Sequence, residues 1–415
     1  MMMQLRPHQQ RALDAMLANG KGQVYCPTGG GKTYIMIAHA LQHIAKATSP
    51  QTIVVVAPRI LLANQLHSEF SEFLTDAKVM HVHSGETVEF HSTKPHDISS
   101  WVVYQQGGGY HTLVFTTYHS LPKVIDAGIH VDVAYFDEAH NATGKAHFEG
   151  VFAMSQHADA CYYFTATPRN HRGSAYQRGM NNVDVYGPVL CNVPAPELIA
   201  AGAIVPPQIV PFETDLVRMK ENAHEVDANN LLGILDSLDD TQNAKVLVAA
   251  PNTKVLWRML SQTAILKEVT DRGYEVLHIT SKHGAYVNDQ KVSREVFFKT
   301  LSSYGSNPTK KFLVFHYSIL SEGINCPGLT HTVLLRNLPI IEMAQTIGRV
   351  IRVDSEDRAN VEAGKYPAGA FSFYKKPCGF VTVPLTQKYG AAIAKRLQRV
   401  VDSIFIEGVP PAVFI

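Results

Sequence analysis

Short runs of β-branched and other apolar residues alternate with helical patterns along the first half of the chain, and the same alternation starts again in the second half. Strands that alternate with helical segments are typical of a mostly parallel sheet covered by helices. In the first half the expected strands are 23–26, 52–57, 78–83, 112–116, 131–136 and 160–165. In the second half they are 245–250, 275–279, 311–315 and 331–335. We therefore predict an α/β fold of two lobes in tandem.

A proline-rich segment separates the two series of strands. Residues 191–211 contain five prolines. Proline fixes φ and lacks a backbone N–H, so this segment suits a linker better than a central strand. The predicted domains are a first lobe over 1–190, a linker over 191–210, a second lobe over 211–355 and a C-terminal extension over 356–415. The extension has apolar residues at helical spacing, which predicts a helix packed against the second lobe. These residues are Ile393, Leu397, Val400 and Ile404.

The composition excludes several classes of protein. Hydrophobic residues make up 46% and charged residues 18% of the 415 residues, as in soluble globular proteins. No apolar run approaches the ~20 residues that cross a bilayer, and the first ten residues do not resemble a signal peptide. We therefore expect no membrane partner, no secretion, and a cytoplasmic location, or a nuclear one in a eukaryote. The five cysteines lie singly, which argues against a zinc site and favours free thiols.

A glycine-rich loop, Cys-Pro-Thr-Gly-Gly-Gly-Lys-Thr, follows the first expected strand and precedes a helical pattern. Glycines allow backbone N–H groups to turn around phosphate oxygens without a Cβ clash. Lys32 can reach the β- and γ-phosphates, and the Thr33 hydroxyl can ligate Mg²⁺. The loop predicts that the chain binds a nucleoside triphosphate with Mg²⁺. Its expected binding residues are Pro27, Thr28, Gly29, Gly30, Gly31, Lys32 and Thr33.

The strand expected at 131–136 is followed by Asp-Glu-Ala-His. A carboxylate at this edge of the sheet lies beside the phosphate loop, where Asp137 can hold Mg²⁺ through water. Glu138 is then placed to orient or deprotonate the attacking water. His140 is a candidate to link the nucleotide site to the rest of the protein. The alternative is a strand end capped by solvated acids, and the upstream phosphate loop favours the catalytic interpretation.

With both motifs present, the chain resembles superfamily 2 nucleic-acid helicases and translocases of the DEAH-box type, over residues 5–353. The segment Leu-Arg-Pro-His-Gln at 5–9 is similar to the adenine-reading segment of that family. Ala-Pro-Arg at 57–59 resembles motif Ia, and Thr-Ala-Thr at 165–167 resembles motif III. Residues 321–325 resemble motif V. Residues 345–352 resemble motif VI, with Thr346 where many relatives have Arg.

Two further segments narrow the resemblance. Residues 197–206 and the Ala-Thr-Gly after the DEAH box are most similar to the UvsW/XPB and restriction-translocase branch. Within that branch, we predict that the chain is a phage or viral member.

The resemblance implies two RecA-like lobes, each a mostly parallel sheet flanked by helices, with a short C-terminal extension. It implies ATP as the nucleotide and roles for further residues. Arg6 and Gln9 would contact adenine, with Gln10 as the alternative reader, and Gly323 of motif V would contact the nucleotide. Thr165 and Thr167 would couple hydrolysis to movement. The implied nucleic-acid contacts are Arg59, Thr117, Tyr118, Thr280 and Ser281.

The pattern around motif VI supports a helix independently of the resemblance. If this segment is a helix, with 100° per residue, its apolar residues form one stripe and its polar residues form another face. The stripe is Ile340, Ala344, Ile347 and Ile351, and the polar face is Glu342, Gln345, Arg349 and Arg352. Such a helix would bury one side and present two arginines outward. Because Arg fits developing phosphate charge through its fork of donors, Gln345, Arg349 and Arg352 are candidate catalytic residues that reach the cleft from the second lobe.

These observations predict an ATP-dependent nucleic-acid helicase or translocase, with DNA favoured over RNA as its partner. The net charge of only +1 means that contact with nucleic acid must come from local patches. Either the motor acts alone on structured DNA, or protein partners supply targeting. Three alternatives stay open: a nucleic-acid-binding ATPase switch that does not move, an RNA helicase, and a small-molecule phosphotransferase, which motifs V and VI disfavour.

Overall fold

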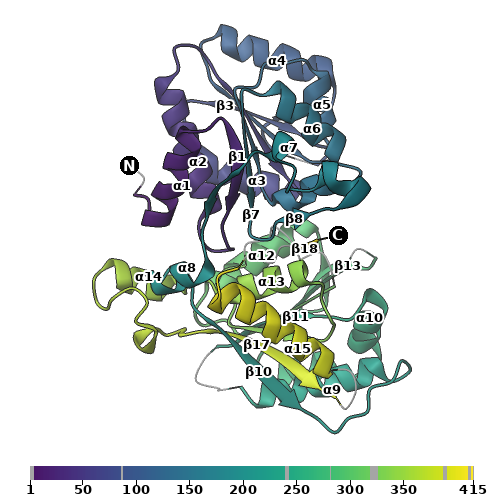
Figure 1. The fold of residues 1–415 in the computed structure, drawn as a ribbon. Coiled ribbons are helices and arrows are strands. Elements are labelled where there is room, and N and C mark those ends of the chain that lie inside the picture. Colours follow the sequence, from purple (N-terminus) through teal and green to yellow (C-terminus); the bar gives the residue numbers. More distant parts are fainter. Residues whose placement is uncertain are drawn as a thin grey trace. The chain divides into compact units, whose positions relative to one another are not determined.

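The computed structural model describes residues 4–85, 87–238, 243–280, 282–317, 326–386, 390–409 and 413–414. The chain divides into two compact units. The first comprises the described residues up to Pro194 together with the C-terminal strand, and the second comprises Ala195–Val409. Each unit is built on its own sheet, as the ribbon in Figure 1 shows.

The first unit contains an eight-stranded sheet in the order β4-β3-β5-β2-β6-β7-β1-β9, and every pairing in it is parallel. Its strands are β1 (Lys21–Tyr25), β2 (Thr52–Ala57), β3 (Lys78–Val82), β4 (Phe90–His91), β5 (Thr112–Thr117), β6 (Val133–Phe136), β7 (Ala160–Thr165) and β9 (Val189–Asn192). Its helices are α1 (Pro7–Leu17), α2 (Lys32–Lys46), α3 (Ile60–Ser71), α4 (Pro95–Gly107), α5 (Leu121–Asp126), α6 (Phe148–His157), α7 (Val183–Tyr186) and the short 3₁₀ turns η1 (Ala139–Thr143) and η2 (Gly173–Arg178).

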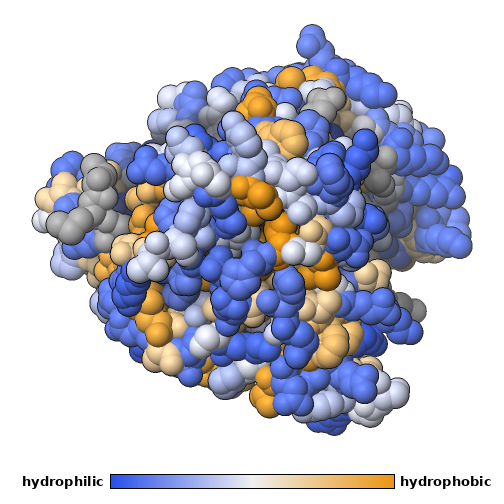
Figure 2. All heavy atoms as spheres, turned by 90° about the horizontal axis from the view of Figure 1, so that it is seen from above, coloured by the Kyte–Doolittle hydropathy of each residue, from blue (hydrophilic) through white to orange (hydrophobic). Residues whose placement is uncertain are grey.

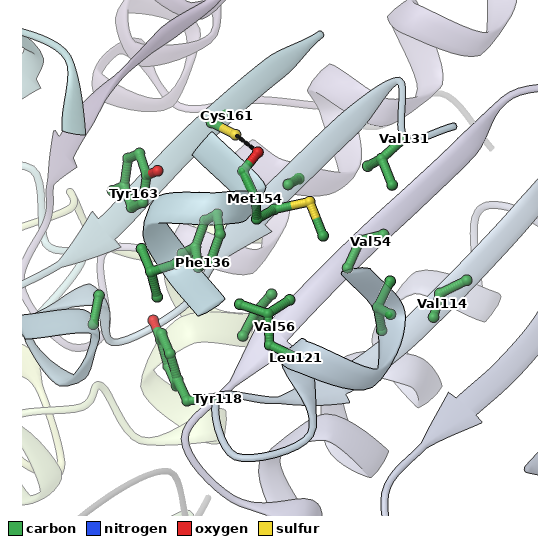
Figure 3. Packing of buried hydrophobic residues seen from close by; sticks show 14 of the residues in the cluster. Val54, Val56, Val114, Tyr118, Leu121, Val131, Phe136, Met154, Cys161 and Tyr163 are labelled. Carbon is green, nitrogen blue, oxygen red and sulfur yellow. Dashed lines mark hydrogen bonds between the residues drawn. The ribbon is translucent and has the colours of Figure 1, made fainter. Parts of the chain in front are cut away.

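The core of the first unit lies against both faces of this sheet. Every residue of β2 and β6 is buried, as is usual for parallel strands covered by helices on both sides. Figure 3 shows Val54, Val56 and Phe136 from these strands packed against Met154 and Leu121 of the covering helices. This packing fixes the strand ends, from which the loops of the candidate site emerge.

The second unit also contains an eight-stranded sheet, in the order β10-β17-β16-β11-β15-β12-β13-β14. The pairings are parallel except for the antiparallel pairs β12–β13 and β13–β14. Its strands are β10 (Pro207–Glu213), β11 (Lys245–Ala249), β12 (Glu275–Thr280), β13 (Gly284–Val287), β14 (Gln290–Val292), β15 (Phe312–His316), β16 (His331–Leu334) and β17 (Gly379–Leu385). Its helices are α8 (Ala195–Ala200), α9 (Ala223–Asp236), α10 (Thr253–Gln262), α11 (Ile265–Asp271), α12 (Arg294–Ser306), α13 (Ile340–Val350), α14 (Ser355–Glu362), α15 (Gly390–Val401), the 3₁₀ turn η3 (Phe371–Phe373) and the π-helical turn η4 (Asp402–Ile406).

The predicted fold class is confirmed, because two mostly parallel sheets flanked by helices are the architecture of tandem RecA-like lobes. All ten strands expected from the sequence are present, most within one or two residues of the expected bounds.

The segments expected as linker and extension contribute more to the sheets than the sequence indicated. Residues 191–210 include the end of β9, helix α8 and the start of β10. The prolines of β10 are tolerated because it is an edge strand. The extension supplies β17, which lies between β10 and β16 inside the second sheet. Its predicted apolar stripe, Ile393, Leu397 and Val400 of α15 and Ile404 of η4, is buried.

The C-terminal strand β18 (Val413–Phe414) pairs in parallel with β8 (Arg169–Asn170) of the first unit. The chain therefore returns to the first unit after completing the second.

The face seen in Figure 2 is mostly hydrophilic, with hydrophobic residues in small areas between the polar ones. Single exposed apolar side chains of this kind are normal on soluble proteins. Among the described residues, no helix combines the length and the apolar character that crossing a bilayer requires.

Three histidines of the first unit, of which His81 and His83 are buried and His67 is partly exposed, form a hydrogen-bonded chain. His81 Nδ1 lies 3.0 Å from His83 Nε2, and His81 Nε2 lies 3.1 Å from His67 Nδ1. The Gly85 N–H donates to His83 Nδ1 at 3.2 Å. The neutral His83 therefore carries its proton on Nε2 and can donate to His81, which can donate in turn to His67. The chain is satisfied when all three rings are neutral, and burial together with the neighbouring rings lowers the pKa of His81 to about 3.

We expect this protein to lose stability as the pH falls from about 6.5 towards 4. Burial also lowers the pKa of His39, His278 and His331 to about 4 and that of His316 to about 3. At pH values between these folded-state pKa values and the pKa of histidine in the unfolded chain, the unfolded chain binds protons that the folded chain does not. Acid therefore favours unfolding. Burial raises the pKa of Asp137 and Asp227, which acts in the opposite direction but at fewer sites.

Denaturant unfolding at pH 7, 6 and 5 measures this effect. We expect the free energy of unfolding to fall by more than about 1.4 kcal/mol per pH unit, the value for one group. His81→Gln should lessen the slope. A free energy of unfolding that is equal at pH 7 and pH 5 would contradict the prediction.

Candidate nucleotide-binding site

The glycine-rich loop connects β1 to α2, as the sequence predicts. Gly29 has φ +90° and Gly31, the N-cap of α2, has φ +81°, a region that residues with a Cβ rarely adopt. The loop therefore ends at the N-terminus of a 15-residue helix, with free backbone N–H groups and the positive end of the helix dipole. This combination binds phosphate in many proteins.

Two side chains of α1, His8 and Gln9, contact the loop. His8 Nε2 lies 2.9 Å from the Gly30 carbonyl oxygen, and Gln9 Nε2 donates to the same oxygen at 3.3 Å. Gln9 Oε1 accepts from the Arg6 backbone N–H at 2.9 Å. Gln10 is exposed and donates to Asp14. Of the two glutamines considered from the sequence, the structure thus brings Gln9 to the phosphate loop. The contact of His8 was not anticipated, although its neighbour Gln9 was.

Gly31→Ala should destabilise the protein more than the matched change Gly128→Ala. Both glycines have positive φ, but a Cβ on Gly31 would lie 2.3 Å from Gln9 Nε2, whereas nothing lies within 4 Å of a Cβ on Gly128. Backbone strain alone costs about 1–2 kcal/mol, so both variants lose that amount and only Gly31→Ala must also displace Gln9. Thermal unfolding checks the order, and equal melting temperatures for the two variants would contradict it.

The Asp-Glu-Ala-His segment follows β6 and meets the phosphate loop. Lys32 Nζ and Glu138 Oε1 are 2.8 Å apart, and their side chains are only 11% and 13% exposed. Glu138 has φ +46°, an unusual value for a residue with a side chain. This backbone conformation occurs where the chain turns out of β6 into η1, at the residue that pairs with Lys32. The sequence predicted that these carboxylates lie beside the phosphate loop, and the structure places Glu138 against Lys32.

Burial dominates the electrostatics of this group. It raises the pKa of Asp137 to about 6, with Lys32 acting to lower it and Glu138 acting to raise it further. Burial alone would lower the pKa of Lys32, but the charges of Glu138 and Asp137 outweigh it and the net pKa is raised. Lys32 is therefore a permanent cation beside two carboxylates.

The donor set fits a hydrated Mg²⁺. Among the described residues, Asp137 Oδ1 is a buried carboxylate oxygen without a hydrogen-bond partner. The backbone oxygen of Asp137 accepts from Tyr118 Oη at 2.9 Å, which holds the residue in place. Hard oxygen ligands of this kind suit Mg²⁺, as does the Thr33 hydroxyl at the start of α2. Asp137 and Thr33 are the residues that would hold the ion.

His140 connects the carboxylates to the end of β7. Its Nδ1 lies 3.6 Å from Glu138 Oε2, 3.0 Å from Thr165 Oγ1 and 3.3 Å from Thr167 Oγ1. Thr165 Oγ1 also accepts from the Thr167 backbone N–H at 3.0 Å. The three residues expected to link hydrolysis to the rest of the protein thus form one buried network with Glu138.

The residues that the resemblance implies as nucleic-acid contacts differ in their exposure. Tyr118 is 1% exposed and its ring is part of the core in Figure 3, so the expectation of a surface contact through this side chain is wrong. Tyr118 directly follows β5 and its ring packs inward, where its hydroxyl donates to the backbone oxygen of Asp137. Thr117 and Thr280 are also buried, and their hydroxyls accept from the backbone N–H groups of Ser120 and His283. Arg59, the residue before α3, is partly exposed. Ser281 lies outside the described residues.

Helix α13 carries motif VI in the second unit. Ala344, Ile347 and Ile351 of its predicted apolar stripe are buried, whereas Ile340 is 40% exposed. Gln345 and Arg349 are also buried, so the division into one buried and one exposed face was too simple. The physical reason is that α13 contacts α15 as well as β16 and β17 and is covered on more than one side. Arg352 is partly buried, and its backbone oxygen accepts from Lys376 Nζ at 2.7 Å. Gly323 lies outside the described residues.

The geometry of the first unit is that of a P-loop nucleotide site at the carboxyl edge of a parallel sheet. Residues 2–170 match the family model of the type III restriction enzyme res subunit. Sequence comparison with curated proteins gives no match.

Several solved structures share the fold of the whole chain. The ATP-dependent type ISP restriction-modification enzyme LlaBIII bound to DNA has a TM-score of 0.72 and 15% identity, covering 100% of this chain and 31% of that one. Dbp5 of S. cerevisiae, bound to RNA and ADP BeF3, has a TM-score of 0.57 and 14% identity, covering 98% and 89%. The helicase Lhr of Mycobacterium smegmatis, bound to ssDNA and AMP-PNP, has a TM-score of 0.58 and 13% identity, covering 96% and 48%.

The chain therefore spans about a third of the length of the first of these structures. At these identities the likeness concerns the fold. The family match of residues 2–170 and this fold support the superfamily 2 resemblance. The narrower branch and the phage or viral origin stay predictions.

Proposed function

We propose that this protein is an ATP-dependent translocase or helicase that acts on nucleic acid, with DNA favoured over RNA. The observation that carries the proposal is the group of Lys32, Glu138 and buried Asp137 beside the glycine-rich loop. A cation, a metal-binding carboxylate and a second carboxylate in this arrangement are the parts that phosphoryl transfer to water requires. The nucleic-acid ligands of the structurally similar proteins support the choice of partner.

The roles within the site follow from its contacts. The loop N–H groups and Lys32 would bind the β- and γ-phosphates, and Thr33 and Asp137 would hold Mg²⁺, which supplies charge neutralisation at the transferred phosphate. Glu138 would accept the proton of the attacking water. Lys32 Nζ lies 2.8 Å from Glu138 Oε1 and so occupies the carboxylate that the attacking water would need. We therefore propose that Lys32 moves from Glu138 to phosphate when the nucleotide binds. That exchange would free Glu138 for its role as base.

We propose that the hydrogen bonds of His140 transmit the effect of nucleotide binding from the site to the rest of the protein. Because His140 contacts Glu138, Thr165 and Thr167, a shift of Glu138 on nucleotide binding would alter the end of β7. Gln345, Arg349 and Arg352 of motif VI, and Gly323 of motif V, keep the roles in hydrolysis and nucleotide contact that the resemblance implies. Arg59, Thr117, Thr280 and Ser281 keep their implied roles near the nucleic-acid backbone.

Steady-state ATP hydrolysis tests this function. It should be measured without nucleic acid and with single-stranded DNA, branched DNA and RNA. We expect DNA to stimulate hydrolysis several-fold or more. Stimulation by RNA alone would overturn the choice of DNA. Hydrolysis that no nucleic acid changes would overturn the proposal and favour a phosphotransferase or a partner-dependent switch.

A further inference from the structure

Four aromatic rings form a continuous array in the second unit. The rings of Trp257 and His283 are stacked, with centroids 3.9 Å apart and planes at 6°. Tyr286 lies 6.5 Å from Trp257 and stacks on His278 at 4.6 Å. The rings come from helix α10 (Trp257), strand β12 (His278), the turn after β12 (His283) and strand β13 (Tyr286). Figure 1 labels α10 and β13 in the second unit.

The array is separate from the hydrophobic core. Helix α10 buries Leu256, Met259 and Leu260 in the core of the second unit, but Trp257 is not part of that core. Trp257, His283 and Tyr286 are each partly exposed, and only His278 is buried. A tryptophan needed only for packing would be expected on the buried side of the helix. Trp257 instead covers the start of an exposed hairpin.

The charge around the array is strongly positive. Helix α10 and residues 280–294 together contain five basic side chains and one acidic one, in a chain whose net charge is only +1. Lys254 lies one helical turn before Trp257, and Lys282 precedes His283 in the chain. A Cβ on Gly284 would lie 3.3 Å from the Lys291 side chain, which places Lys291 beside the same turn. In the described part of the chain, no carboxylate lies within ion-pair distance of these three lysines.

The array also lies at the functional edge of its sheet. Helix α10 begins four residues after β11 ends at Ala249, and His283 follows the end of β12 at Thr280. Both therefore belong to the carboxyl edge of parallel strands, where open α/β sheets bind their ligands.

We infer that Trp257, His283 and Tyr286 form a stacking platform for the bases of single-stranded nucleic acid, with the surrounding lysines placed to contact its phosphates. This inference rests on the proposed function and deepens it, because it names unpaired strand as the form that the second unit binds. Partly exposed aromatic rings interleaved with basic side chains are the combination that binds single strands without sequence preference.

The two tryptophans allow a direct test, since the chain contains only Trp101 and Trp257. Trp101 belongs to α4 in the first unit, so Trp101→Phe leaves Trp257 as the sole reporter. Oligo(dT) should then quench the emission saturably, and a duplex of the same length should not. Trp257→Leu and His283→Ala should each weaken oligo(dT) binding about tenfold, the loss of one stacked base, and Trp257→Phe should retain most of the affinity. ATP hydrolysis without nucleic acid should be unchanged in all of them.

The outcomes separate this inference from the proposed function. Equal oligo(dT) affinities for the wild type and Trp257→Leu, with stimulated hydrolysis intact, would overturn the platform and leave the motor standing. Equal quenching by duplex would also overturn it, because paired bases cannot stack on the rings. A wild type that neither binds oligo(dT) nor shows nucleic-acid-stimulated hydrolysis would overturn both.

Discussion

Glu138→Gln should reduce the turnover of ATP by about 10²–10⁴-fold, the usual contribution of a general base, while ATP binding stays within a few-fold of the wild type. Gln has the shape of Glu but cannot accept a proton. It also lacks the charge that holds Lys32 Nζ at 2.8 Å, so Lys32 is easier to recruit to phosphate. Single-turnover hydrolysis and equilibrium binding of a fluorescent ATP analogue measure the two quantities separately.

The matched control for this variant is Glu149→Gln, an exposed glutamate in the same unit. It should hydrolyse ATP at the wild-type rate. Parallel losses of turnover and binding in Glu138→Gln would mean that Glu138 only supports the fold of the site, and a normal rate would remove it from the mechanism.

Lys32→Ala should lower both ATP affinity and hydrolysis, with a rate loss of about 10²–10³-fold, as for the removal of one group that stabilises developing charge. The same change should destabilise the protein without nucleotide. Lys32 is the cation beside two buried carboxylates, and removing one partner of a buried pair leaves an uncompensated charge that costs about 3 kcal/mol or more. Lys123→Ala, at an exposed lysine on α5, is the control.

A double variant tests the reason for this destabilisation. In Lys32→Ala with Glu138→Gln, one of the two carboxylates is gone, so part of the lost free energy of unfolding should return. Urea unfolding of the two single variants, the double variant and the wild type gives the coupling. Additive effects would contradict the buried ion pair as the source of the loss.

Local patterns were sufficient for the elements that build the site. The β-branched run of β2 and the largely aromatic run of β7 match their expected bounds, since parallel strands buried on both faces have near-continuous apolar sequences. The glycines of the phosphate loop and the Asp-Glu pair after β6 predicted that the two carboxylates lie beside the phosphate loop. The structure places them there because the carboxyl ends of the parallel strands β1 and β6 lie at the same edge of one sheet.

Other features depend on partners far away in the sequence. Strand β17 enters the second sheet between β10 and β16, and no local pattern states where a strand pairs. From its position after β5, Tyr118 is expected to contact a ligand, but its hydroxyl donates to the backbone oxygen of Asp137. The turn of the β13–β14 hairpin did leave a local signal, because Asn288 and Asp289 both tolerate the positive φ that they adopt there. The chain of His67, His81 and His83 joins α3 to β3 and could not be predicted from spacing.

The central claim is that ATP hydrolysis at the Lys32 and Glu138 site drives movement along DNA. Displacement of streptavidin from the biotinylated end of single-stranded DNA tests it most directly, with the wild type and Glu138→Gln compared at saturating ATP. Our account predicts that the wild type displaces the streptavidin only when ATP is present, and that Glu138→Gln binds the same DNA without displacing it. DNA-stimulated hydrolysis with no displacement by the wild type would contradict the claim and identify the protein as a stationary ATPase switch.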